Sequence, residues 1–287
     1  HAAMLGLRDY VHKNGLKSVV LGLSGGIDSA VVAALAVDAL GAENVHCLML
    51  PYRYTSEASL RDAKACAETL GVRYDIVPIG APVDAINESL AAVFEGRAPD
   101  ITEENLQSRM RGTILMAVSN KLGSLLITTG NKSEMAVGYA TIYGDMNGAY
   151  NPIKDMPKMQ VYGLAEWRNS YYPTDVRGPS GVVIPPEIIS KAPSAELRPD
   201  QTDQDSLPPY PVLDAIIEAL VEDELSLAEI VAKGFDAELV KRIERLIYIA
   251  EFKRRQSAPG PKLTPKAFGI GRKYPITSGY RDGSVAR

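Results

Sequence analysis

A short polar stretch, Ser24-Gly-Gly-Ile-Asp-Ser29, carries residue types that together bind phosphate. It follows an apolar run at residues 18–23, which predicts a buried strand, and precedes an Ala/Val/Leu-rich segment at 27–40, which predicts a helix. Adjacent glycines let backbone N–H groups approach an anion closely, and the helix directs its positive dipole end to the same place. We therefore expect a phosphate group to bind in this loop.

Three chemistries are compatible with such a loop. A Walker-type phosphate loop ends in Lys-Ser or Lys-Thr, whereas Asp28-Ser29 stands here. The string Gly22-Leu-Ser-Gly-Gly26 fits the G-x-S-x-G elbow of serine hydrolases, but an elbow serine needs a histidine base, usually late in the chain, and no histidine follows His46. We favour the third interpretation, in which the serines and backbone amides cradle a pyrophosphate and Asp28 is a ligand of Mg²⁺.

Apolar strands alternate with helices from residue 18 to residue 129. We expect strands at 18–23, 45–50, 74–79 and 125–129, and helices at 27–40, 56–70, 83–94 and 105–122. This alternation predicts an α/β fold, a doubly wound parallel sheet with helices on both faces. Because ligands bind at the carboxyl ends of the strands in such sheets, residues 22–29 and 128–131 should share one edge.

The second half of the chain is less regular. Residues 130–157 lack sustained periodicity and predict an extended active-site segment, and the proline-rich residues 172–211 predict an irregular excursion or a mobile lid. Helices are expected at 161–170, 212–222, 226–233 and 236–255. We therefore expect a single domain over 1–255, with the irregular segment and C-terminal helices appended to the sheet. A basic Pro/Gly-rich tail, 256–287, should pack on this domain or be partly mobile.

Length and composition narrow the class of protein. With 287 residues and 46% hydrophobic content, the chain can form one large core or a core with a small appendage. The longest apolar run, residues 30–37, is far shorter than the ~20 residues that cross a bilayer, and no charged-then-apolar leader opens the sequence. We expect a cytoplasmic protein without a membrane partner. Cys47 and Cys66 should be reduced core residues, and the tail, interrupted by prolines and without a series of aromatic residues, should bind no nucleic acid.

Several motifs resemble a known family. The loop at 24–29 resembles that of the N-type ATP pyrophosphatases, which cleave ATP between its α and β phosphates. Further strings resemble NAD synthetase in their order and approximate spacing: Thr129-Gly-Asn-Lys-Ser-Glu134, Tyr143-Gly-Asp145, Pro152 with Lys158, Lys191-Ala-Pro-Ser-Ala-Glu-Leu197 and Glu251-Phe-Lys-Arg-Arg255. The resemblance covers nearly the whole chain. It implies the adenine-nucleotide alpha-hydrolase-like fold and a homodimer.

The strings at 105–111, 254–263 and 267–276 look like the glutamine-dependent branch of that family. In that branch a nitrilase-like glutaminase domain precedes the synthetase domain, and no part of this chain corresponds to it. The resemblance therefore implies the synthetase part alone, using ammonia that is either free or delivered from glutamine by an absent domain.

The activity implied is a carbon–nitrogen ligase reaction that amidates deamido-NAD to NAD. The nicotinate carboxylate attacks the α-phosphorus of ATP and releases pyrophosphate, and ammonia then displaces AMP from the adenylate. By resemblance, Asp28 and Lys158 are catalytic, and Asp28 and Glu134 hold Mg²⁺. The expected ATP contacts are Gly22, Leu23, Ser24, Gly25, Gly26, Ile27, Asp28, Ser29, Thr129, Lys158 and Ser194.

Deamido-NAD is expected to contact Asn105, Arg109, Glu134 and Lys253. Asn105 and Arg109 are four residues apart on a predicted helix and so share one face. Ile142, Ala149 and Phe252 stand where the ammonia-dependent branch carries a lysine, an aspartate and a histidine, so those contacts are not transferred. Two alternatives stay open: another N-type ATP pyrophosphatase, such as a tRNA-modifying enzyme, and a nucleotide-binding module without catalysis.

Overall fold

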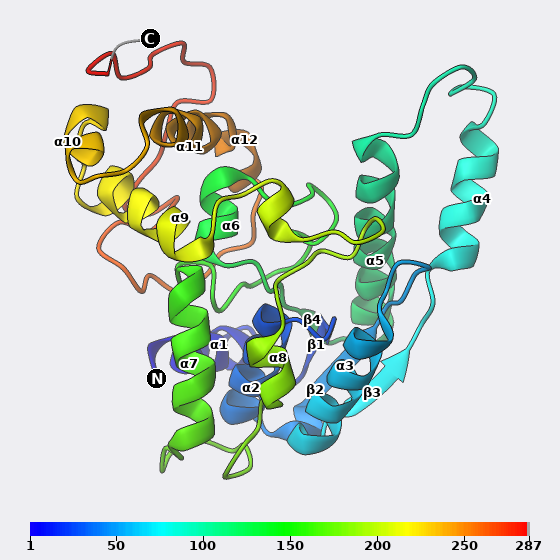
Figure 1. Cartoon of the computed structure of the whole chain (residues 1–287). Coiled ribbons are helices and arrows are strands. Elements are labelled where there is room, and N and C mark those ends of the chain that lie inside the picture. Colours follow the sequence, from blue (N-terminus) through cyan, green and yellow to red (C-terminus); the bar gives the residue numbers. More distant parts are fainter. Residues whose placement is uncertain (286–287) are drawn as a thin grey trace.

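Four parallel strands form the centre of the structure, which is a computed structural model describing residues 1–285 (Figure 1). The strands are β1 Val19–Gly22, β2 Val45–Met49, β3 Arg73–Ile76 and β4 Leu125–Leu126, in the order β3-β2-β1-β4. In the register of the sheet, Val19 pairs with both Val45 and Leu125. Because all strands run in the same direction, their carboxyl ends, where the predicted loop begins, lie along one edge.

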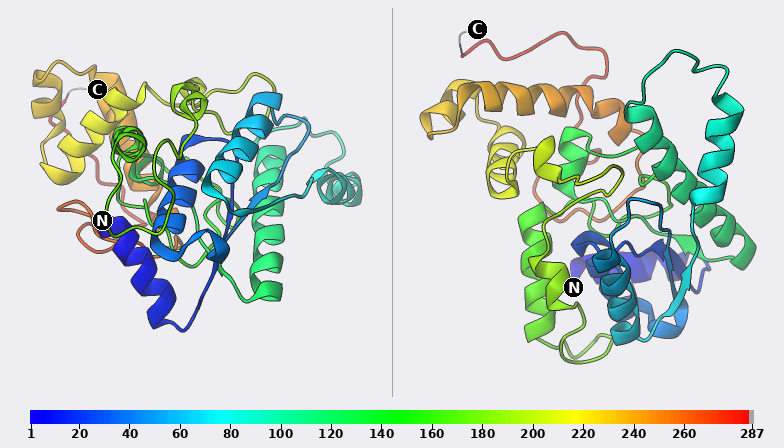
Figure 2. Two further views of the ribbon diagram at one scale, coloured as in Figure 1. Left: turned by 90° about the horizontal axis from the view of Figure 1, so that it is seen from below. Right: turned by 45° about the vertical axis from the view of Figure 1, so that its right-hand side comes forward.

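Helices cover both faces of this sheet, as the left view in Figure 2 shows. The side chains of Val19 and Leu21 pack on one face, into a core with α1 Ala2–Lys13, α2 Ile27–Leu40, α3 Glu57–Leu70, α7 Lys158–Ser170 and α8 Pro186–Ser190. Val20 and Leu48 point to the other face, against α4 Gly80–Leu90 and α5 Ile101–Leu122. Strand residues alternate between the two faces, and the central strand β1 is apolar because both of its faces are covered. The edge strand β3 is less buried and carries Arg73 and Asp75.

A second group of helices lies beyond the sheet, at the upper left of Figure 1. It consists of α6 Lys132–Val137, α9 Tyr210–Ile217, a π-helix at Glu218–Glu222, α10 Leu227–Ala232, α11 Ala237–Ile249 and α12 Glu251–Arg254. Their apolar side chains form a core of their own, which Phe268 and Tyr274 of the C-terminal segment complete. The short helix α6 thus belongs to this second core, although it follows β4 closely in the sequence.

The predicted fold class, a parallel α/β sheet with helices on both faces, is confirmed. The boundaries differ where local capping or tertiary contacts decide them. α5 begins at Ile101 rather than at residue 105, because Asp100 and Glu103 form a capping box. The helix expected over 236–255 is interrupted at Ala250. β4 contains two residues only, since the chain beyond it pairs with Tyr150 as an isolated bridge.

Two helices occur where the sequence predicted irregular chain. α6 lies within residues 130–157, and α8, five residues long, lies within residues 172–211. α6 has six residues, too few for a periodic pattern, and is fixed by an Asn131–Glu134 capping box and by Gly138 in the left-handed conformation. Of the predicted tail, residues 286 and 287 lie outside the described residues.

Cys47 and Cys66 are free and buried, as expected, and burial raises the pKa of both thiols. Among residues 1–285, no helix combines the length and apolar character needed to cross a bilayer.

Candidate functional site

The glycine-rich loop connects β1 to α2 at the carboxyl edge of the sheet. Gly25 has φ 78° and lies so close to α3 that a Cβ here would be 2.4 Å from the carbonyl oxygen of Ser59, so glycine is required. The Ser24 and Ser29 hydroxyls are hydrogen-bonded at 3.1 Å, and the Gly26 N–H donates to Ser24 Oγ at 3.2 Å. No side chain caps the N-terminus of α2, which leaves its first amide groups facing the cavity.

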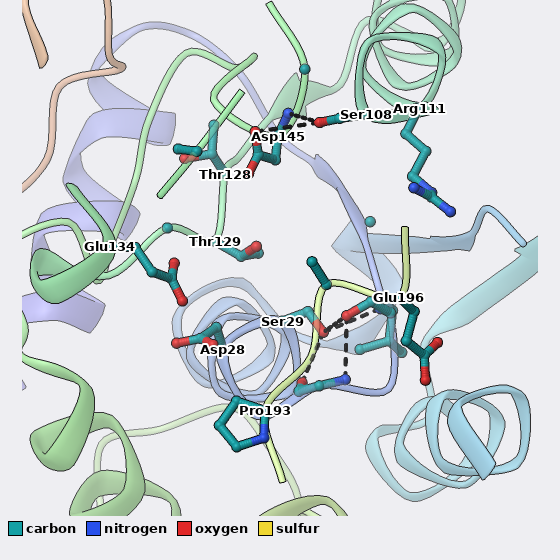
Figure 3. Close-up of a pocket in the computed structure, with 18 of the residues that line it drawn as sticks. Asp28, Ser29, Ser108, Arg111, Thr128, Thr129, Glu134, Asp145, Pro193 and Glu196 are labelled. Atoms are coloured by element: carbon teal, nitrogen blue, oxygen red, sulfur yellow. Dashed lines mark hydrogen bonds between the residues drawn. The ribbon is translucent and has the colours of Figure 1, made fainter. Parts of the chain in front are cut away.

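This loop borders a cavity of about 310 Å³ (Figure 3). The cavity collects residues from the loop, the ends of β2 and β4, α5, the start of α7 and the segment after α8. Of the ATP contacts predicted from the sequence, all but Gly25 line it. The carboxyl edge predicted from strand order therefore is the place where distant segments of the chain meet.

A buried lysine joins two acids beside the loop. The Lys158 side chain, 2% exposed, donates a hydrogen bond to Asp28 Oδ2, and its Nζ lies 3.3 Å from Glu134 Oε1. Asp28 and Glu134 retain 18% and 17% exposure and both line the cavity. The cluster therefore presents two carboxylates and one ammonium group to a ligand, with a net charge near minus one if all three groups are ionised.

Asn131 fixes Asp28 and Glu134 relative to each other through hydrogen bonds. Its Nδ2 donates to Asp28 Oδ1 at 2.9 Å, and its Oδ1 accepts a hydrogen bond from the Glu134 N–H at 2.9 Å. The Glu134 carboxylate accepts a hydrogen bond from the Asn131 N–H at 3.4 Å. One fully buried amide side chain thus links the first turn of α2 to the first turn of α6.

The charges in this cluster shift the pKa values of its members. Burial and the neighbouring Asp28 carboxylate raise the pKa of Glu134 to about 8. Burial by itself disfavours the Lys158 ammonium, but the carboxylates of Asp28 and Glu134 outweigh it and raise the pKa of Lys158. Lys158 therefore stays protonated at neutral pH, and the Glu134 carboxyl holds its proton more tightly than an ordinary glutamate.

The opposite wall of the cavity carries an arginine without an acidic partner. Arg111 projects from α5 into the cavity, and its Nε donates to the carbonyl oxygen of Leu50 at 2.9 Å (Figure 3). Burial lowers the pKa of this guanidinium to about 10, while the nearby carboxylates of Glu196 and Asp145 partly oppose the shift. In the described part of the chain neither acid forms a direct ion pair with Arg111, so this cation at the cavity wall is well suited to bind a phosphate or another acceptor group of a ligand.

Next to Arg111, Asp145 is held by Ser108 and by the Thr141 N–H at 2.6 Å. Burial raises the pKa of Asp145. Thr128 and Thr129 line the cavity between this wall and Glu134 (Figure 3).

Residues 191–197 line the cavity on the side of α3. Ser194, a predicted ATP contact, donates to the carbonyl oxygen of Gln201 at 2.5 Å and accepts a hydrogen bond from the Glu196 N–H. Glu196, at φ 49°, accepts hydrogen bonds from Ser56 and Ser59 at the N-terminus of α3. The segment is therefore fixed to α3 in this conformation, and whether it moves as a lid stays a prediction.

The predicted deamido-NAD contacts divide into two groups. Glu134 lines the cavity, whereas Asn105, Arg109 and Lys253 do not. Lys253 donates to the carbonyl oxygens of Gly138 and Ala140, and Arg109 to that of Ile142, so the segment after α6 holds both cations. Asn105 Oδ1 accepts a hydrogen bond from Thr141 on the same segment. These three side chains contact the same segment but do not line the cavity.

Hard carboxylate oxygens are the ligands that Mg²⁺ prefers, and the ion usually takes one or two carboxylates together with phosphates and waters. Asp28 and Glu134, both at the cavity wall, fit this pattern. Within residues 1–285 there is no group of three or more His, Cys, Asp or Glu side chains able to hold a metal ion.

Several cavity residues carry chemistry that sequence reasoning did not assign. Arg111, Asp145, Lys191 and Glu196 stand within motifs singled out above, which is the signal that pointed to their segments. Ser108, in the singled-out string 105–111, also lines the cavity, and so does Asp203, which lies in none of the singled-out motifs and is revealed only by the tertiary structure. Asp203 accepts hydrogen bonds from Tyr139 and Tyr210 and belongs to the segment before α9.

A glycine-rich loop between a strand and a helix, at the carboxyl edge of a parallel sheet, is typical of the nucleotide-binding α/β proteins. Within that class it belongs to the NAD synthase family, because the family model described as NAD synthase matches residues 1–257. Membership in this family sets aside the alternative of a tRNA-modifying pyrophosphatase.

Relatives agree with this assignment. The glutamine-dependent NAD(+) synthetase of Rhodobacter capsulatus is 60% identical over 283 residues, which are 99% of this chain and 51% of the relative. The structure of glutamine-dependent NAD+ synthetase from Acinetobacter baumannii in complex with ADP is 45% identical, with a TM-score of 0.63, over 98% of this chain and 49% of that one. The NMN synthetase of Francisella tularensis is 27% identical, with a TM-score of 0.73, over 91% of this chain and 96% of that one. The chain spans about half the length of the curated relatives it matches.

Proposed function

We propose that the chain catalyses the ATP-dependent amidation of deamido-NAD to NAD. A carboxylate oxygen of the nicotinate attacks the α-phosphorus, the bond to the β-phosphate oxygen breaks, and pyrophosphate leaves. The nitrogen of ammonia then adds to the acyl carbon, loses a proton, and AMP leaves with the oxygen that joined it to the acyl group. The observation that carries this proposal is the Asp28–Lys158–Glu134 cluster beside the phosphate loop of an NAD synthase family member.

The residues of the cavity have different roles in this reaction. The loop amides and the hydroxyls of Ser24 and Ser29 hold the phosphates that leave, while the Lys158 ammonium neutralises charge that develops at the α-phosphate. Arg111 binds an acceptor group of the nucleotide on the opposite wall. Asp28 and Glu134 would hold Mg²⁺, and the ion would neutralise part of the triphosphate charge when bound.

Asn105, Arg109 and Lys253, which lie outside the cavity, bind deamido-NAD in this proposal. Arg109 and Lys253 supply two cations that share one supporting segment, and a dinucleotide carries a pyrophosphate that matches them. Asn105 stands on the same helix as Arg109 and is fixed by Thr141. The nicotinate end would then extend past Glu134 toward the α-phosphate.

The remaining assignments follow the family. We infer that the chain works in the cytoplasm as a homodimer and uses free ammonia when alone. We also infer that in a longer protein a glutaminase domain would supply ammonia, as the names of the glutamine-dependent relatives suggest.

The test is pyrophosphate release from the purified chain with ATP, Mg²⁺ and ammonium. Release should require deamido-NAD and should be accompanied by equal amounts of AMP and NAD. A parallel reaction with nicotinate mononucleotide separates this proposal from the activity named for the Francisella tularensis protein. Faster turnover of the mononucleotide would reassign the substrate, and ADP binding without AMP formation with either acceptor would favour a non-catalytic nucleotide-binding module.

A further inference from the structure

The C-terminal segment after residue 257 lies beyond the matched family model, yet it contacts the helix that carries Glu134. Lys132, the first residue of α6, is 2% exposed. Its ammonium group donates to Thr264 Oγ1 at 2.5 Å and to the carbonyl oxygen of Lys266 at 3.3 Å. Two partners of this buried cation therefore come from the C-terminal segment.

Two acids complete the surroundings of Lys132. Asp155 Oδ1 lies 3.0 Å from its Nζ, and Glu222 of the π-helix accepts a hydrogen bond from it. Asp155 also accepts the N–H groups of Leu263 and Thr264, both at 2.7 Å, and Glu222 accepts the Lys266 N–H at 2.8 Å. Each acid thus joins Lys132 to the backbone of the C-terminal segment, which makes the contact a network rather than a single bond.

The other end of α6 is held by Arg254 of α12, which the C-terminal segment contacts through Phe268. Arg254 donates to the carbonyl oxygens of Met135 and Ala136, which are terminal groups of this short helix. The Phe268 ring lies 4.6 Å from the Arg254 guanidinium and 5.9 Å from Lys132 Nζ. One aromatic ring therefore contacts the two cations that hold the two ends of α6.

α6 needs such support because it has six residues and cannot be stable alone. It carries Glu134 and begins at Asn131, which binds Asp28. A small rotation of this helix would separate Glu134 from Lys158 and Asn131 from Asp28.

We propose that residues 263–268 are a positioning element for the active site, which holds α6 through Lys132 and Phe268 and so keeps Asn131 and Glu134 in place against Asp28 and Lys158. The proposal rests on the amidation proposed above for its activity measurements. Thr264 and Phe268 are positioning residues in this scheme, since neither lines the cavity.

The hydroxyl of Thr264 can be removed with little change of shape. Thr264→Val keeps the backbone N–H that binds Asp155 but loses the hydroxyl shared by Lys132 and Asp155, whereas Thr264→Ser retains it. Phe268→Leu removes the aromatic ring and keeps an apolar side chain. Ile270→Ala, at a side chain that is 69% exposed on the same segment, is the matched control.

Two measurements test the proposal. Ammonia-dependent turnover should fall about 10- to 100-fold in kcat in T264V and F268L, the usual cost of losing a group that orients a ligating side chain. T264S and I270A should stay close to wild type, and the KM for ammonium should not change in any variant. Amide hydrogen exchange of residues 132–137 should accelerate in T264V and F268L at a temperature where all variants are folded.

Wild-type kcat in T264V and F268L, unchanged exchange in α6, or an equal loss in T264S would each overturn the proposal. An inactive wild-type chain would refute the amidation instead, and the exchange comparison would still decide whether the C-terminal segment holds α6.

Discussion

Lys158 at the start of α7 donates a hydrogen bond to Asp28 in the first turn of α2, across 130 residues of sequence. The contact brings a fully buried ammonium group to the edge of the phosphate loop. Because Asn131 binds the other oxygen of the same carboxylate, Asp28 is the residue at which the loop, α6 and α7 meet.

Replacement of Asp28 by alanine should abolish most pyrophosphate release. The change removes one of the two carboxylates proposed to hold Mg²⁺ and leaves Lys158 without its closer partner, so we expect a loss of about 100-fold or more in kcat. Asp9→Ala is the matched control, because Asp9 is an exposed acid of α1 that pairs with Lys13. Circular dichroism should show both variants folded. Near-normal turnover in D28A would show that Asp28 has no catalytic role.

Gly25 should not tolerate a side chain. In Gly25→Ala the new methyl group would meet the Ser59 carbonyl at 2.4 Å in a residue with positive φ, so the loop must distort and ADP binding should weaken by at least about tenfold. Gly163→Ala in α7 meets no atom within 4 Å and should bind ADP normally. Isothermal titration calorimetry with ADP compares the two. Equal affinities would mean that the loop does not hold the phosphates.

The loop and the α/β fold could be predicted from the sequence because both depend on local signals. Adjacent glycines between an apolar strand and a helix indicate a tight loop at this place, and alternating strands and helices indicate the parallel sheet. The binding of phosphate by the loop stays a prediction. α6 was not predicted, because six residues are too few for a periodic pattern and because much of its support comes from Arg254, Glu222 and Thr264, which lie 90 or more residues away. The cavity position of Arg111 was likewise hidden, because a helical arginine on the sequence alone is indistinguishable from its exposed neighbour Arg109.

Substitution of Arg109 and of Arg111, both in α5, should each affect the binding of a different substrate. Arg111→Leu removes the unpaired cation of the cavity wall, so ADP affinity should fall about tenfold to 100-fold, the worth of one charged hydrogen bond. Arg109→Leu should leave ADP affinity unchanged and raise the KM for deamido-NAD. Fluorescence or calorimetric titration with ADP, followed by steady-state kinetics, measures both effects. If R109L and R111L weaken ADP binding equally, the assignment of Arg111 to the adenine nucleotide and of Arg109 to deamido-NAD is wrong.

The raised pKa of Glu134 should make the ligand-free protein less stable as the pH rises. The pKa of this carboxyl is about 8 in the folded protein against an ordinary value of 4.5, so the folded state binds the proton more tightly. The stabilisation is complete below pH 4.5 and is lost as the pH rises through 8, at up to about 1.4 kcal/mol per pH unit inside that window. Glu134→Gln, which is neutral at every pH, should not show this contribution. Urea denaturation of the wild type and of E134Q between pH 5 and pH 9 covers most of this window. It gives the difference between the two proteins in the free energy of unfolding at each pH. A difference that stays constant across this range would show that Glu134 titrates at its ordinary pKa and that burial beside Asp28 does not hold its proton.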